Sequence, residues 1–268
     1  MPKHFLSLMH YCLALIFLFI TNQTGAQSSD YQAEDGQNQQ IVLPVRQICA
    51  GKPWPQIVWI HVHDDEQTAR QVAIQTLDNL EQGCLVDLPH GGQREISIKN
   101  INVSYHFDPN RIFTISGRKK ALKCQQGDCN LAMDQLTQAV QQLLNRYLHQ
   151  AKLIVAIHNN HANGLSVLHY RPTATKANDV RQIAINPDQN PHDFFFVTTQ
   201  QAFDFLSQRG FNVVWQDNEK VQDDGSLSVW SAQHKIDYIN IEAGVGHTSV
   251  QTTMLAAVLN YMHTYYLH

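Results

Sequence analysis

The chain lacks several features that would assign it to a common class. Only 16% of its 268 residues are charged, and 19 Lys and Arg residues are outnumbered by 23 Asp and Glu residues. No basic stripe is present, so we do not expect nucleic-acid binding. A Gly-x-Ser-x-Gly motif and an internal repeat are also missing, which argues against a serine hydrolase and a repeat architecture. The 43% of apolar residues suits a globular protein with a sizeable core.

A hydrophobic run long enough to span a membrane is also missing near the N-terminus. The apolar segment from Tyr11 to Ile20 is shorter than the roughly 20 residues that a spanning helix needs. It follows Lys3 and precedes Thr24-Gly25-Ala26, small residues typical of a cleavage site. We therefore expect a signal peptide over residues 1–26 rather than an uncleaved anchor. No stable membrane span remains after cleavage, and the expected location is periplasmic or secreted.

Cysteines are few but even in number once the signal peptide is removed. Cys12 leaves with that peptide, and four remain: Cys49, Cys84, Cys124 and Cys129. An even number in an exported chain predicts two disulfides, one closing the short loop between Cys124 and Cys129 and one joining Cys49 to Cys84. Zinc binding by these thiols is the alternative. The absence of a Cys-x-x-Cys pair and the oxidising compartment favour disulfides.

After a polar, flexible lead-in over residues 27–40, the pattern alternates between strands and helices with no dividing linker. Strands are expected over residues 41–45, 57–62, 84–88, 95–98, 102–106, 152–157, 193–198, 212–215 and 238–241, and residues 165–170 also alternate. Helices are expected over residues 67–81, 131–148, 200–208 and 248–266. Such alternation indicates a single layered α/β domain over residues 41–268.

Imidazoles and carboxylates follow three of the apolar strands. His63 and Glu66 come after the strand at 57–62, His158 ends the buried run at 152–157, and Glu242 ends the strand at 238–241. Open α/β sheets place their sites at the carboxyl ends of strands. Imidazole nitrogens and carboxylate oxygens are ligands of catalytic zinc, which usually takes three from the protein. His63, Glu66 and His158 are therefore the expected metal ligands.

The remaining candidates supply a base and a carboxylate clamp. Glu242 follows a buried strand and would take and return a proton beside the metal. Asn110 and Arg111 lie in a loop, where a planar guanidinium can bind a substrate carboxylate in two places. His61 lies on the same strand face as His63 but lacks a Glu three residues on, and His161 stands close to His158.

In this order, the residues resemble the zinc carboxypeptidase superfamily, and most closely its aspartoacylase and succinylglutamate desuccinylase branch. The shared pattern is His-x-x-Glu, an Asn-Arg pair, a later His and a late Glu; Phe107-Asp108-Pro109-Asn110-Arg111-Ile112-Phe113 is similar to the branch's Asp-x-Asn-Arg-x-Phe loop. The resemblance covers about Ile57 to the last helix. It implies a three-layer α/β/α fold with a mixed, mostly parallel central sheet, and one Zn²⁺ ion.

The resemblance also implies roles. His63, Glu66 and His158 hold zinc, Glu242 is general base and then acid, and Asn110 and Arg111 anchor a carboxylate. An arginine that polarises the carbonyl is matched to Arg94, with Arg118 and Arg171 as rivals. The chain departs from the family at Ala156, where an Asp often supports the third ligand.

The leading hypothesis is an exported zinc metallocarboxypeptidase or amidohydrolase. It cleaves an amide bond near a free carboxylate, in a peptide, such as a cell-wall peptide, or in an N-acyl amino acid. A non-catalytic carboxylate-binding protein on the same fold and an N-acyl amino acid deacylase are the alternatives. Ala156 and the ambiguous arginine favour the non-catalytic alternative.

Overall fold

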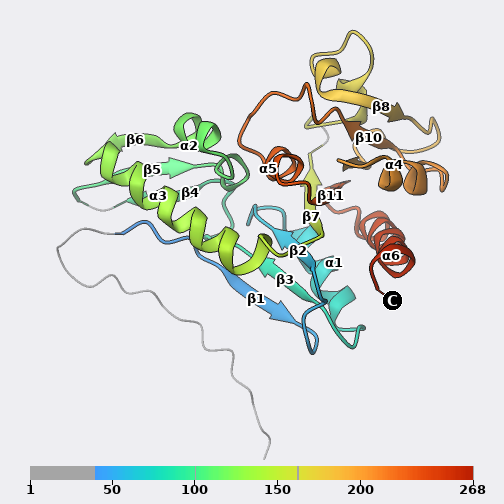
Figure 1. The fold of residues 1–268 in the computed structure, drawn as a ribbon, viewed down its shortest axis with the longest axis horizontal. Coiled ribbons are helices and arrows are strands. Elements are labelled where there is room, and N and C mark those ends of the chain that lie inside the picture. The colour runs from blue at the N-terminus through green and yellow to red at the C-terminus, as the bar shows by residue number, and fades with distance from the viewer. Residues whose placement is uncertain (1–39, 100, 162, 268) are drawn as a thin grey trace, which may run out of the picture. The chain divides into compact units, whose positions relative to one another are not determined.

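A mixed eight-stranded sheet forms the centre of the structure, a computed structural model that describes residues 40–99, 101–161 and 163–267 (Figure 1). The strand order is β1-β3-β2-β7-β11-β9-β10-β8. The pairs β3-β2, β2-β7, β7-β11 and β9-β10 are parallel and the other three are antiparallel. The predicted mixed, mostly parallel sheet is confirmed. The expected signal peptide over residues 1–26, and the lead-in over 27–40 except for Gln40, lie outside the described residues.

The strands are β1 Arg46–Cys49, β2 Ile57–His61, β3 Cys84–Asp87, β4 Ile96–Lys99, β5 Ser104–Phe107, β6 Lys123–Gln126, β7 Leu153–Asn160, β8 Val180–Ala184, β9 Phe194–Val197, β10 Val213–Gln216 and β11 Asp237–Gly244. The α-helices are α1 Gln67–Leu77, α2 Ile115–Ala121, α3 Cys129–Leu143, α4 Gln200–Ser207, α5 Leu227–Gln233 and α6 Thr248–Tyr265. Shorter helical segments are η1 Pro109–Arg111, η2 Leu144–Leu148, η3 Val167–Tyr170 and η4 Ala177–Asp179.

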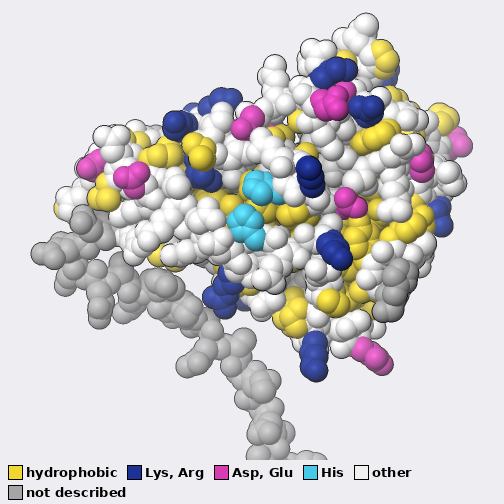
Figure 2. All heavy atoms as spheres, in the orientation of Figure 1, with side chains coloured by type: hydrophobic (Ala, Val, Ile, Leu, Met, Phe, Trp, Pro, Cys, Tyr) yellow, Lys and Arg dark blue, Asp and Glu magenta, His cyan; other side chains and the backbone are white. Residues whose placement is uncertain are grey.

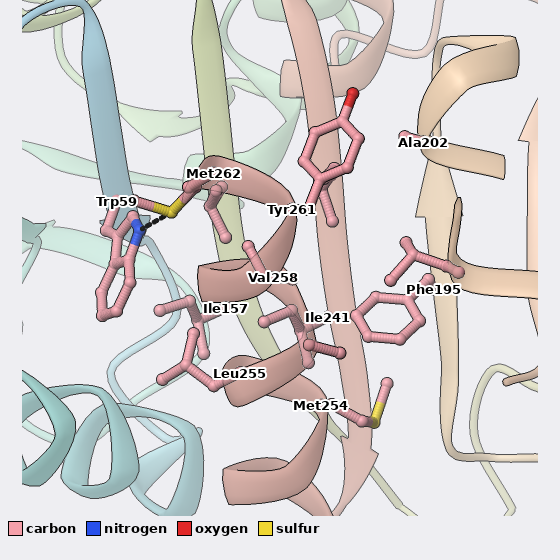
Figure 3. Close-up of a cluster of buried hydrophobic side chains, with 14 of the residues drawn as sticks. Trp59, Ile157, Phe195, Ala202, Ile241, Met254, Leu255, Val258, Tyr261 and Met262 are labelled. Carbon is pink, nitrogen blue, oxygen red and sulfur yellow. Dashed lines mark hydrogen bonds between the residues drawn. The ribbon is translucent and has the colours of Figure 1, made fainter. Parts of the chain in front are cut away.

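Helices cover both faces of the large sheet, which makes the predicted three layers. Helices α1, α4 and α6 share one hydrophobic cluster with the first face, whereas α3 and α5 share a second cluster with the opposite face. In Figure 3, Trp59, Ile157 and Ile241 point from their strands toward α6, and the Trp59 indole donates to Met262 Sδ at 3.5 Å. Burying these large apolar side chains fixes which face of each strand turns toward α6.

The alternation along β7 decides where its polar end points. Val155 and Ile157 pack in the first cluster, while Ile154 and Ala156 pack in the second. Because successive side chains in a strand point to opposite faces, His158 follows Ala156 onto the second face. The alternation of apolar side chains along β7 therefore determines the face of the sheet on which His158 lies.

A second, three-stranded sheet, β4-β5-β6, lies beside α3 (Figure 1). Both predicted disulfide pairings are present: Cys124–Cys129 ties β6 to the first residue of α3, and Cys49–Cys84 joins residues that face each other across β1 and β3.

Some element predictions were wrong. Residues 41–45 form no strand; Ile41 is instead buried in the second cluster, its backbone N–H donating to Gln135 Oε1 at 3.1 Å. The alternating residues 165–170 contain the 3₁₀ helix η3, which is begun by Ser166, whose side chain accepts from Leu168 N. Pattern alone missed β1, α2, β6, β8 and α5. Helix α5 is seven residues long and mostly buried, so it shows no amphipathic period.

On the face drawn in Figure 2, acidic and basic side chains are interspersed, with histidine side chains near the middle. Within the described ranges, no helix combines the length and apolar character needed to cross a bilayer.

Asp87, at the end of β3, is a fully buried carboxylate that holds a charge cluster behind the strand ends. Its Oδ2 accepts from Arg46 Nη2 at 2.8 Å and from Arg70 Nε at 2.9 Å, and its Oδ1 lies 2.9 Å from His61 Nδ1. Burial alone would raise the pKa of Asp87, but hydrogen bonds from His61, Arg46 and Arg70 hold that pKa well below its usual range.

Replacing Asp87 should therefore destabilise the fold and change its acid response. We expect Asp87→Asn to lower the free energy of unfolding at pH 7 by about 2 kcal/mol, because it removes the buried charge to which the partly exposed Arg46 and Arg70 donate. A depressed pKa stabilises the fold above the ordinary carboxyl pKa of about 4, and that stability is lost as the pH falls toward the folded-state value. Urea unfolding at several pH values should show a shallower acid loss in the variant, whereas Asp78→Asn, at an exposed position, should match the wild type. An unchanged acid profile in Asp87→Asn would contradict this account.

Candidate metal centre and substrate cleft

The candidate site lies where β2, β7 and β11 approach their carboxyl ends. His63 comes two residues after β2, and His158 and Glu242 face each other across the parallel pair β7-β11. Both strands run three residues further than expected, so His158 and Glu242 lie within strands rather than just after them. Neighbouring strands are about 4.8 Å apart, which places the two side chains next to each other on one face.

Three side chains converge in the way that a metal ion requires. Ligand atoms of His63, Glu66 and His158 all lie within 4.8 Å of one another, and all three residues are buried. His63 Nδ1 lies 2.9 Å from Glu66 Oε1, and His158 Nδ1 lies 2.8 Å from Glu66 Oε2. The two Nδ1 atoms are 3.2 Å apart. Two nitrogens on one tetrahedral zinc would lie about 3.3 Å apart, so the donor set fits this ion.

The electrostatics of the group also favour a cation. Burial alone would raise the pKa of Glu66, but the neighbouring His158 and His63 hold it well below the usual range, so Glu66 is a carboxylate. Burial also opposes protonation of His63, yet hydrogen bonds to Asp108 and Glu66 raise its pKa to about 9. Carboxylates that hold a proton on a buried imidazole this strongly would equally attract a metal cation.

Asp108 supports this candidate centre, although the sequence predicts no role for it. Its Oδ1 lies 2.8 Å from His63 Nε2, the nitrogen that faces away from the other two ligands. The same oxygen accepts from Asn110 N at 2.7 Å and so begins the helical turn η1. A carboxylate on the outer nitrogen of a ligand His orients the ring and makes it a better donor. In the sequence, the Asp-Pro-Asn-Arg motif that contains Asp108 was the feature that could have indicated this role.

Glu66 is held from several further directions. Asn159 N donates to its Oε2 at 3.1 Å, and Arg94 Nη1 donates to its Oε1 at 2.9 Å. Its backbone carbonyl lies 3.2 Å from His61 Nε2, which links it to Asp87. His61 is therefore buried behind the centre and is no part of the ligand group, and His161 lies exposed at the edge of the cleft.

A cleft with a volume of about 480 Å³ opens beside His63, Glu66 and His158. Glu242 lies in it, 7% exposed, and Asn240 Nδ2 donates to Glu242 Oε1 at 2.9 Å. Burial raises the pKa of Glu242. Tyr170 and Tyr238 also line the cleft; burial and the nearby Glu242 raise their pKa values, so both remain neutral phenols.

Asn110 and Arg111 line the same cleft, at η1. Asn110 Oδ1 accepts from Leu227 N at 3.2 Å, which turns its amide nitrogen away from that contact. Arg111 Nη1 lies 3.5 Å from Asp224 Oδ2 in a partly exposed ion pair. Such pairs contribute little stability, so a ligand carboxylate could replace Asp224 at small cost.

Of the three candidate arginines, the structure brings Arg94 into the cleft. Its loop is fixed by Asp64, whose Oδ2 accepts from His90 N and Gly92 N, each at 2.7 Å. Arg118 is buried away from the cleft and donates to Ile112 O at 2.7 Å. Arg171 is exposed and bonds to Leu168 O.

A mixed sheet with helices on both faces and a His-Glu-His group beside a cleft together define a three-layer α/β protein with a candidate metal centre. No protein-family model matches the chain, and no curated protein matches it in sequence.

Solved structures of similar fold include a succinylglutamate desuccinylase/aspartoacylase from Rhodobacter sphaeroides, at 12% identity and a TM-score of 0.43 over 82% of this chain and 59% of that one. A variant of the cell shape determinant protein Csd4 from Helicobacter pylori has 11% identity and a TM-score of 0.48, over 81% and 55%. The murein-tripeptide amidase MpaA from Escherichia coli O157 has 14% identity and a TM-score of 0.41, over 80% and 85%.

The chain thus spans little more than half the length of the first two structures.

The ligand group can be tested through metal content. We expect the purified chain, incubated with zinc and desalted, to retain one zinc ion per molecule by elemental analysis. His63→Ala and His158→Ala should each reduce the retained zinc to below about a tenth, because two ligands do not hold the ion. His161→Ala is the matched control and should retain full zinc. Zinc loss in His161→Ala but not in His158→Ala would refute the assignment.

The role of Asp108 predicts a graded effect. Asp108→Ala should weaken zinc binding by about 10- to 100-fold in chelator competition, because it frees the ring of His63 while leaving every ligand in place. Asp108→Asn keeps an acceptor for His63 Nε2 and should fall between Asp108→Ala and the wild type. Equal zinc affinity in all three proteins would exclude this supporting role.

Proposed function

We propose that the chain is a zinc-dependent hydrolase, a carboxypeptidase or amidohydrolase, that cleaves an amide bond near a free carboxylate. The observation that carries the proposal is the convergence of His63, Glu66 and His158 beside Glu242 in one cleft. A zinc ion held by the three ligands would polarise the amide carbonyl and lower the pKa of water. The catalytic domain is residues 41–268.

Glu242 is the proton carrier of this proposal. Asn240 occupies its Oε1, and no hydrogen bond to Oε2 is found among the described residues, which leaves that oxygen for the proton. Because its pKa is raised, Glu242 exchanges its proton at a pH closer to neutral than an ordinary carboxyl group does. Taking a proton from water and passing it to the leaving amine are then both feasible.

The substrate is held by its carboxylate. Arg111 exchanges Asp224 for the substrate carboxylate, and the amide nitrogen of Asn110 donates to it. Arg94, which is half exposed at the mouth of the centre, faces the carbonyl of the bond to be cut. These contacts fit peptides with a free C-terminus, including those of the cell wall, and N-acyl amino acids. The two disulfides support a periplasmic or secreted location.

The decisive variant is Glu242→Gln, which keeps the shape and the contact with Asn240 but removes the proton acceptor. We expect kcat for amide hydrolysis to fall by about 10²- to 10⁴-fold with zinc content unchanged. The assay uses N-blocked dipeptides and N-acyl amino acids, each with a free and an amidated C-terminus. The amidated forms should react poorly, because Arg111 then has no carboxylate to bind. Zinc and carboxylate binding without hydrolysis of any compound would instead identify a non-catalytic carboxylate-binding protein.

A further inference from the structure

The floor of the cleft beyond Glu242 is formed by β11, β9 and β10. Asn240 in β11 lies opposite Phe196 in β9, and Phe196 lies opposite Val214 in β10, two residues before Gln216. Asn240 and Gln216 both line the cleft, yet they are only 8% and 1% exposed. Two buried amides therefore lie at the base of the cleft, on the side away from β2.

The orientation of each amide is fixed by its nitrogen. Gln216 Nε2 donates to Asn218 Oδ1 at 3.0 Å, and Asn218 is itself held because its Nδ2 donates to Thr198 O at 2.9 Å. Asn240 Nδ2 donates to Glu242 Oε1 at 2.9 Å. Flipping either amide would bring two acceptor oxygens together, so each carbonyl oxygen must point away from these partners.

Those two carbonyl oxygens lack hydrogen bonds. Gln216 Oε1 and Asn240 Oδ1 are buried and have no partner among the described residues. Of the described side chains with such an unpaired atom, only these two line the cleft. A buried acceptor without a donor destabilises the protein, and a ligand that brings N–H groups removes that cost.

We propose that this floor is a subsite for the side chain of the residue that carries the free carboxylate, and that it selects side chains ending in N–H donors, either an ammonium or a primary amide. This inference rests on the proposed function. An aliphatic side chain would leave both acceptors unpaired. A carboxylate on the side chain would place further hydrogen-bond acceptors against Gln216 Oε1 and Asn240 Oδ1. A site built to hydrogen-bond a substrate group discriminates strongly against analogues that lack it.

The test is a panel of N-blocked dipeptides whose C-terminal residue is lysine, glutamine, norleucine or glutamate, each in L- and D-form. For the wild type, we expect lysine or glutamine to exceed norleucine and glutamate in kcat/KM by at least tenfold; comparing lysine with glutamine distinguishes an ammonium from an amide. Gln216→Leu should reduce the ratio of kcat/KM for the lysine or glutamine peptide to kcat/KM for the norleucine peptide to below threefold. Gln182→Leu, the same exchange at an exposed position of β8, should keep the wild-type ratio. The wild-type panel decides the inference even if Gln216→Leu does not fold.

Calorimetry with the free amino acids on the zinc-loaded chain separates this inference from the proposed function. Tighter binding of lysine or glutamine than of norleucine, without hydrolysis of any dipeptide, would keep the subsite and reject the hydrolase. Hydrolysis with norleucine as good as lysine and glutamine would overturn the subsite and keep the hydrolase. Absence of both a binding preference and hydrolysis would reject both proposals.

Discussion

The rest of the site depends on the contacts that the carboxylate of Glu66 makes. It contacts both histidines of the candidate metal centre, accepts from the backbone of Asn159, and binds Arg94. These contacts come from the β2–α1 turn, from β7 and from the loop after β3, so one buried anion joins three segments of the chain. A buried charge is stable only when its partners are in place, and this requirement holds the centre together.

The sheet itself carries two of those partners, His158 and Asn159, both in β7. The apolar alternation of β7 sends His158 to one face, and the parallel register with β11 sets Glu242 beside it. On the other side, Asp87 and His61 fix the backbone carbonyl of Glu66 from within the core. Functional side chains carried by packed strands need no ordering when a ligand arrives, which favours precise placement.

The cleft combines groups that are already paired with groups that are not. Asn240 links the two kinds, because its nitrogen binds the candidate base Glu242 while its oxygen has no partner within the described ranges. Arg111 donates to Asn110 O and forms an ion pair with the partly exposed Asp224. Asn240 thus joins the proposed proton carrier to the proposed amide subsite along β11.

The sequence alone determined most elements and the layered α/β class, because periodicity is a local property, and it determined the pairs of cysteines by their even number and spacing. The mixed sheet was predicted only through the resemblance to a known family. The sequence singled out His63, Glu66 and His158 and the cleft residue Glu242 by their positions after apolar strands. It could not find the role of Asp108 or the unpaired oxygen of Gln216, whose significance depends on which residues lie across from them. Only the tertiary structure decided that Arg94 reaches the cleft and Arg118 does not, because hydrogen bonding and burial join segments that are distant along the chain.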